Sequence, residues 1–291
     1  MPRFRAVRQR RREHREYALS SLVTLLPFTA FAAGEGDGGF HAPSITDFFP
    51  APILFEGTIF EFNRIQMVRL IAAVVMLTFV IIAARRAKLV PGRSQNVMEL
   101  LLNFVRVNVA EEILGAKGRK YVAMLTTIFF AVLAFNLTGV IPGLNIAGTS
   151  LIGLPLVLAA WVFVMYLGAG IRALGLGGFL KNSLFPPGVP IFMYVLLTPI
   201  EFLQVFILRP ATLAIRLMAN MVAGHLMLVL CVSATQFFIV EAGPAMKAFG
   251  VLTFASAFAL TLFEIFVAAL QAYIFVVLTA VYLSLSIEEE H

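Results

Sequence analysis

The amino-acid sequence predicts an all-α membrane protein with five transmembrane helices and one amphipathic interfacial helix, the last two helices being long and tilted. Of its 291 residues, 60% are hydrophobic and only 13% are charged, whereas soluble domains contain roughly a quarter of charged residues. This composition excludes a soluble globular domain, and the high hydrophobicity also excludes intrinsic disorder. Several apolar segments reach the length of about 20 residues that a helix needs to cross a bilayer.

The positive charge of the chain is concentrated at its N-terminus. Residues 1–16 contain seven arginines and two glutamates, which account for most of the net charge of +6. The rest of the chain is nearly neutral, so it is not a basic nucleic-acid-binding protein. A single cysteine, Cys231, excludes a disulfide framework and a cysteine metal cluster.

The first 33 residues have the pattern of a secretory signal peptide. A basic stretch is followed by a short apolar stretch and by small residues near Ala30 and Ala32. The alternative is an uncleaved tail that lies on the membrane. Residues 34–64 are expected to form an extracytoplasmic segment that leads into a membrane-embedded domain at 65–291.

The membrane-embedded domain contains two apolar regions, 188–240 and 250–286, that are longer than a helix needs to cross a bilayer. Their excess length predicts a strong tilt, a kink or a break, and Pro199 and Pro210 offer places for one. Residues 95–113 carry apolar side chains at helical spacing but are interrupted by charges, which is typical of a helix at the membrane interface. The predicted spans are 65–86, 119–141, 150–171, 188–240 and 250–286.

The charges of the connecting loops predict the orientation in the membrane. The connection after the first span is rich in lysine and arginine, while the connection between 119–141 and 150–171 is uncharged. Positively charged loops stay in the cytoplasm. We therefore expect a protein of the plasma membrane with its N-terminus outside the cell and its C-terminus in the cytoplasm.

Polar and ionisable residues interrupt the last two apolar regions. They include Glu201, Gln204, Arg209, Arg216, Asn220, His225, Glu264 and Gln271. A charge at the centre of a bilayer costs about 2.5–3.5 kcal/mol on insertion scales, so such residues usually carry function.

The spacing of these residues indicates how the last two helices pair. In an antiparallel pair, residues at one level have nearly constant sums of residue numbers. This criterion places Arg216 level with Gln271 and His225 level with Glu264. The helical rise separates the two levels by roughly 10–14 Å, with the second level nearer the exterior. An acid and an imidazole above a fixed cation describe a proton path that leads to a barrier.

Each of these residue types suits a different task. Arginine stays charged and does not relay protons near neutral pH, so Arg216 suits the barrier, whereas the charge of a histidine such as His225 changes in the physiological range. The structural alternative is that Arg216 pairs with Glu264 or with another helix. Asn220 is expected to orient Arg216 or to cap a break, and Glu201 to line a cytoplasmic exit or to bond to a neighbouring helix.

The residues of the last two helices resemble those of subunit a of bacterial F-type rotary ATP synthase. The run Leu208–Met221 (LRPATLAIRLMANM), followed by Gly224 and His225, looks like the signature of that family. The last helix of the family is resembled by Glu264 together with Leu270–Phe275 and Val281–Leu283, the end of its third helix by Asn136, Gly139, Ile141 and Pro142, and its first cytoplasmic loop by Arg85 to Glu99. The resemblance runs from about residue 40 to the C-terminus.

The resemblance implies a non-catalytic proton-channel subunit without cofactor or metal. Arg216 would face the carboxylates of the c-subunit ring, His225 and Glu264 would line the exterior half-channel, and Gln271 and Asn220 would lie near Arg216. Some members of the family carry the acid on the penultimate helix and the histidine on the last, so the two are exchanged here. The implied partners are the c ring, the b subunits of the peripheral stalk, the soluble ATPase sector and the lipid bilayer.

Two other functions were weighed against this one. A proton-coupled secondary transporter would use the same polar residues, but such transporters usually contain internal repeats with broken helices, and this sequence has none. A purely structural membrane anchor leaves the intramembrane charges unexplained. Because His225 can titrate and no oxygen-rich cation cage is visible, protons are favoured over sodium as the coupling ion.

Overall fold

A computed structural model describes residues 63–85, 92–141, 146–185 and 190–287. These residues form helices joined by short connections, and no strand occurs among them. The predicted signal peptide at 1–33 and most of the predicted extracytoplasmic segment lie outside the described residues. The α-helices are α2 (Arg64–Arg85), α3 (Arg93–Val105), α4 (Glu112–Leu114), α5 (Val122–Leu137), α6 (Gly153–Leu184), α7 (Tyr194–Leu203), α8 (Arg209–Gln236) and α9 (Lys247–Ile287).

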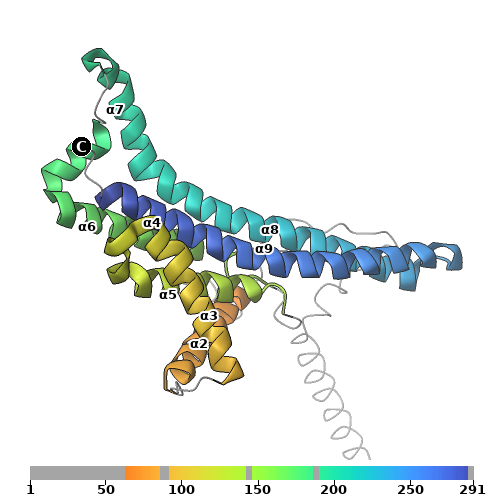
Figure 1. The fold of residues 1–291 in the computed structure, drawn as a ribbon. Coiled ribbons are helices and arrows are strands. Elements are labelled where there is room, and N and C mark those ends of the chain that lie inside the picture. Colours follow the sequence, from red (N-terminus) through yellow and green to blue (C-terminus); the bar gives the residue numbers. More distant parts are fainter. Residues whose placement is uncertain (1–62, 86–91, 142–145, 186–189, 288–291) are drawn as a thin grey trace, which may run out of the picture.

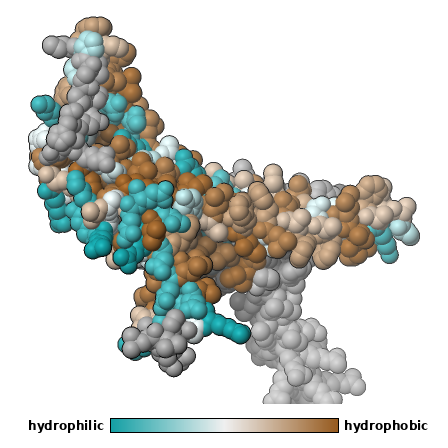
Figure 2. All heavy atoms as spheres, in the orientation of Figure 1, coloured by the Kyte–Doolittle hydropathy of each residue, from teal (hydrophilic) through white to brown (hydrophobic). Residues whose placement is uncertain are grey.

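Five helical segments of the described residues are long and apolar enough to cross a membrane, as predicted. They are Arg64–Arg85, Gln95–Leu137, Gly153–Leu184, Tyr194–Glu241 and Pro244–Ile287. Their side chains are largely apolar on the outside, and Figure 2 shows a nearly continuous hydrophobic surface along α8 and α9. The predicted all-α membrane fold is therefore confirmed.

The segment predicted as an interfacial helix is joined closely to the bundle. After α3 the helix continues through a π-helical turn (Arg106–Glu111) and α4, and it ends at Gly115, whose φ of 57° favours glycine. Val105 and Val109 are fully buried in the core, while the exposed residues are both polar, such as Glu99 and Asn103, and apolar, such as Leu100. The helix is thus amphipathic as predicted, and its apolar face packs on α5 and α9.

The third predicted span is longer than the sequence suggested. The helix α6 does not end near residue 171 but continues to Leu184, with a kink at Gly175 (φ 71°, ψ 164°) that a residue without Cβ adopts readily. Beyond the kink, Phe179 is 2% exposed and packs against Gly170. This apolar contact stabilises a helical segment that lies outside the predicted spans, between residues 171 and 188.

The helices α8 and α9 lie side by side along their length (Figure 1). Half of this pair is embedded in a core shared with α5 and α6, to which α9 contributes Phe275, Val276 and Leu283. The other half extends away from the remaining helices as a two-helix arm (Figure 1). Among the described residues, the arm therefore depends on contacts among α8, α9 and the short helical turns that connect them, Phe237–Glu241 and Pro244–Met246.

The close approach of α6 to its own C-terminal turn and to α9 predicts a strict size limit at Gly170. A Cβ at this position would lie 2.5 Å from the Phe179 ring and 3.0 Å from the Ser286 carbonyl oxygen. We expect Gly170→Ala to destabilise the protein by about 1–3 kcal/mol, since overpacking forces its neighbours to move. Gly168→Ala is the matched control, because nothing lies within 4 Å of its Cβ position. The apparent melting temperature of the purified protein measures both, and equal values would contradict the packing described here.

Candidate functional site

A line of polar contacts joins α8 to α9 in an antiparallel register. The Asn220 side-chain amide donates a hydrogen bond to Gln271 Oε1 at 2.7 Å, and the hydroxyls of Thr235 and Thr253 are 2.9 Å apart. Between these contacts, a Cβ added to Gly224 would lie 3.3 Å from Glu264 Oε1. The antiparallel pairing expected from the residue spacing is therefore confirmed. Gln271, which was expected at the level of Arg216, bonds instead to Asn220, one helical turn further along α8.

The acid and the imidazole predicted to share a level are both buried in this seam. His225 and Glu264 are each 5% exposed. Neither carboxylate oxygen of Glu264 accepts a hydrogen bond from any residue that the structure describes. A buried polar group without a partner is rare and costly in a folded protein, and here Gly224 leaves the room that the carboxyl group occupies. The arrangement offers a proton-exchanging group inside the helix pair.

A third helix brings a positive charge to this site. Arg64, in the first turn of α2, lies within electrostatic range of His225. Arg64 was not expected at this site, because its sequence position shows only that it lies at the start of an apolar span. No residue spacing relates α2 to α8, so only the tertiary structure shows that Arg64 and His225 are near each other.

A second arginine of α2 holds a connection at the same side of the bundle. Arg69 donates hydrogen bonds to the carbonyl oxygens of Gly148 and Leu151, at 2.7 and 3.2 Å. Next to them the Thr149 hydroxyl donates to Asn136 Oδ1 at 2.7 Å. Asn136 is fully buried, and its amide nitrogen has no partner among the described residues. The sequence shows that Arg69 is a charged residue within an apolar run, but it does not show which groups Arg69 bonds to.

Arg216 lies on the outer surface of α8. Its side chain is exposed and makes no hydrogen bond or ion pair with the described part of the chain. The alternative in which Arg216 pairs with Glu264 is therefore not what the described residues show. Its neighbour Ile215 is 54% exposed, so a permanent charge stands on an apolar face. A charge in a membrane-spanning helix usually has a partner or faces a water-filled space, and the described residues provide no hydrogen bond or ion pair for Arg216.

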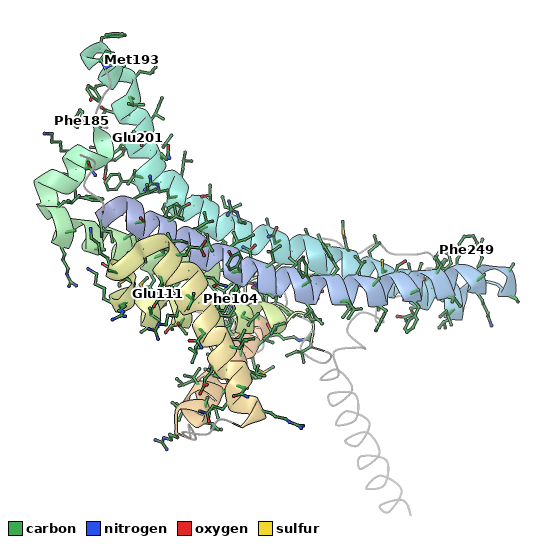
Figure 3. The ribbon with its side chains drawn as sticks, viewed as in Figure 1. Phe104, Glu111, Phe185, Met193, Glu201 and Phe249 are labelled. Carbon is green, nitrogen blue, oxygen red and sulfur yellow. The ribbon has the colours of Figure 1, made fainter. Side chains whose placement is uncertain are left out.

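Glu201 lies on α7, close to where this helix leads into α8 (Figure 3). It is half-buried and forms no hydrogen bond or ion pair within the described ranges. The expected bond to a neighbouring helix is thus not observed there. Within those ranges no group of histidine, cysteine, aspartate or glutamate residues could hold a metal ion.

Comparison with known proteins agrees with this geometry. The model of a protein family described as "ATP synthase A chain" matches residues 66–284. The chain belongs to this family. It is 47% identical over 268 residues to ATP synthase subunit a of Rhodococcus erythropolis, covering 91% of this chain and 96% of the relative. It is 40% identical over 252 residues to that of a Parafrankia species (85% and 84% covered) and 35% identical over 260 residues to that of Streptomyces lividans (87% and 90%).

The resemblance read from the two last helices is confirmed by these matches. The protein is a non-catalytic membrane subunit of the proton-transporting ATP synthase and works within that complex. The roles predicted for the individual residues of α7, α8 and α9 stay predictions.

The register of α8 and α9 can be tested by a disulfide. Because the hydroxyls of Thr235 and Thr253 are in contact, Thr235→Cys with Thr253→Cys should form a bond on mild oxidation, which requires Cβ atoms about 3.5–4.5 Å apart. The background is Cys231→Ala, which removes the natural cysteine. The matched control is Thr235→Cys with Ser256→Cys, since Ser256 is exposed and bonds within its own helix. Electrophoretic mobility reports the bond, and equal cross-linking of both pairs would contradict the register.

Proposed function

We propose that Arg216 is the fixed charge of the proton channel and faces the carboxylates of the c-subunit ring. The observation that carries this proposal is an exposed arginine on an apolar, membrane-spanning face, without a partner among the described residues. A ring that presents one carboxylate after another supplies the missing countercharge. Arginine attracts each arriving carboxylate, favours its ionised form and does not itself pass on a proton.

The exterior half-channel is formed by the seam around His225 and Glu264. Protons enter there and neutralise a ring carboxylate, which then leaves Arg216 and travels through lipid as the ring turns. His225 is nine residues beyond Arg216, or about 13 Å along the helix. This separation keeps the proton-exchanging groups on one side of the fixed charge, while Gln271 and Asn220 hold the two helices together near Arg216.

The cytoplasmic half-channel lies on the other side of Arg216 and includes Glu201. Glu201 precedes Arg216 by fifteen residues and thus lies roughly 20 Å from it along the helical axis. Its half-buried carboxyl has no partner among the described residues, so it is available to a departing proton. A direct leak between the two half-channels is blocked by the charge of Arg216.

The subunit is placed in the plasma membrane with its C-terminus in the cytoplasm. Lys117, Arg119 and Lys120 are exposed in the turn between α4 and α5, and positively charged turns stay on the cytoplasmic side. The b subunits of the peripheral stalk and the soluble ATPase sector are then the remaining partners.

Removal of the fixed charge tests the proposal most directly. We expect Arg216→Ala to abolish ATP-driven acidification of inverted membrane vesicles in an assembled complex. Arg216→Lys should also fail to restore full transport, because lysine carries its charge as a compact, more strongly hydrated group. Arg172→Ala, which removes an exposed arginine from α6, is the matched control. Undiminished acidification with Arg216→Ala would overturn the proposal.

The proton-exchanging pair can be tested by exchange of its members. Glu264→Gln keeps the shape of the side chain but cannot take up a proton, so we expect proton transport to fall by about a hundredfold, as for the loss of a general acid or base. The double variant His225→Glu with Glu264→His restores an acid and an imidazole on the two helices. It should transport protons faster than either single variant. A double variant no better than the worse single one would contradict a shared role.

A further inference from the structure

The junction between α7 and α8 contains a backbone carbonyl that the helix itself does not satisfy. Residues Gln204–Leu208 form a π-helical turn, in which the Arg209 N–H donates to the Gln204 carbonyl five residues back. The next donor in this pattern would be residue 210, opposite the carbonyl of Val205. That residue is Pro210, which has no N–H.

The missing donor is supplied by a tyrosine from another helix. The Tyr166 hydroxyl, on α6, donates a hydrogen bond of 2.5 Å to the Val205 carbonyl oxygen. Tyr166 is 1% exposed and Val205 is 3% exposed, so water does not compete for this contact. Because an unsatisfied buried carbonyl is costly, the hydroxyl stabilises the π-turn over a regular α-helical junction.

The tyrosine is itself held in place by aromatic packing. Its ring meets those of Phe163 and Tyr282 edge to face, with centroids 5.4 and 6.1 Å apart. The Arg209 guanidinium lies over the Tyr282 ring at 5.4 Å. The π-turn is therefore packed between α6 and α9. The Tyr166 hydroxyl is also held in position by the packing of its ring, and not only by its hydrogen bond.

The π-turn decides which way α7 faces. An α-helix turns by about 100° per residue, so the extra residue that a π-turn accommodates rotates the flanking helices relative to each other by about that angle. The facing of α8 is fixed by its contacts with α9, from Asn220–Gln271 to Thr235–Thr253. By contrast, α7 has no buried residue of its own, and the Thr198 hydroxyl ties it to the end of α6 only by a long hydrogen bond to the Leu184 carbonyl oxygen, at 3.3 Å. The rotation therefore changes the orientation of α7, and with it the direction in which the Glu201 carboxyl group faces.

We propose that Tyr166 is a positioning residue that sets the facing of Glu201 relative to Arg216 through the Val205 carbonyl. This inference rests on the proposed function, because it gives Glu201 a place in the cytoplasmic half-channel. The inference goes beyond that function because it identifies the group that determines the orientation of the Glu201 carboxyl. This group is the Tyr166 hydroxyl on α6, a helix that contributes no group to the proton path.

The facing of α7 can be measured by cysteine labelling in the intact complex. In a Cys231→Ala background, single cysteines replace Ile200, Phe202 or Leu203, which are 50%, 50% and 45% exposed. Their reactivity toward a maleimide is compared in inverted vesicles with and without Tyr166→Phe. We expect the order of reactivity to change, with at least one ratio shifting by about fivefold or more. Tyr121→Phe, which alters another buried tyrosine, should leave the order unchanged, and an unchanged order with Tyr166→Phe overturns the inference.

Proton transport then tests whether the hydroxyl acts through Glu201. Tyr166→Phe should lower ATP-driven acidification about fivefold at unchanged subunit content, and it should cause no further loss when Glu201→Gln is already present. Additive losses, or transport equal to that of the wild type, overturn the inference. The parallel Arg216→Ala variant separates the two ideas. If it still pumps, the proposed function fails, whereas the labelling order continues to report on Tyr166.

A second variant keeps the test decisive if Tyr166→Phe does not assemble. Adding Pro210→Ala returns an N–H to the position that a π-turn pairs with Val205. The double variant Tyr166→Phe with Pro210→Ala is then expected to assemble and to pump, since the carbonyl again has a donor. A double variant that does not assemble would overturn the inference.

Discussion

The hydrogen bond between Asn220 and Gln271 defines the geometry on which the other functional features depend. In the hydrocarbon region polar groups must find partners within the protein, and this pair does so across α8 and α9 at 2.7 Å. A shift of one residue in either helix would break the bond and would move Gly224 away from Glu264. The register that satisfies two amides therefore also buries the carboxyl group and leaves Arg216 on the outer face.

The same constraint explains why α8 differs so much along its length. Near Arg216 the pair is supported by α5 and α6, with Leu213 and Leu217 nearly inaccessible in the shared core. Toward Thr235 the helices α5 and α6 no longer pack against the pair (Figure 1). There α8 and α9 contact each other through smaller side chains, such as those of Thr235 and Thr253. Arg216 therefore lies on the part of α8 that is packed against the core of the bundle.

The sequence predicted what depends on composition and on spacing along a helix. It identified Arg216, His225 and Glu264 as exceptional because each interrupts an apolar run. For an antiparallel pair, the residue numbers predicted the register to within about one turn, since Gln271 bonds to Asn220 and not at the level of Arg216. It did not predict the continuation of α6 to Leu184, which depends on the packing of Phe179 against Gly170. The proximity of residues on helices with no shared periodicity, such as Arg64 and His225, leaves no pattern in one sequence.

Proline and tyrosine at the junction of α7 and α8 illustrate how a local conflict is resolved by a distant residue. Pro210 removes a backbone donor where the chain is buried, and a helix alone would relieve this by bending or by exposing the carbonyl of Val205 to water. In a membrane the second course is closed, so a donor must come from another helix. Tyr166 meets that need, and it thereby links the path of α7 to the packing of α6 and α9. The two ends of the segment that carries Glu201 and Arg216 are thus fixed by different neighbours, and their relative facing is a property of the whole bundle.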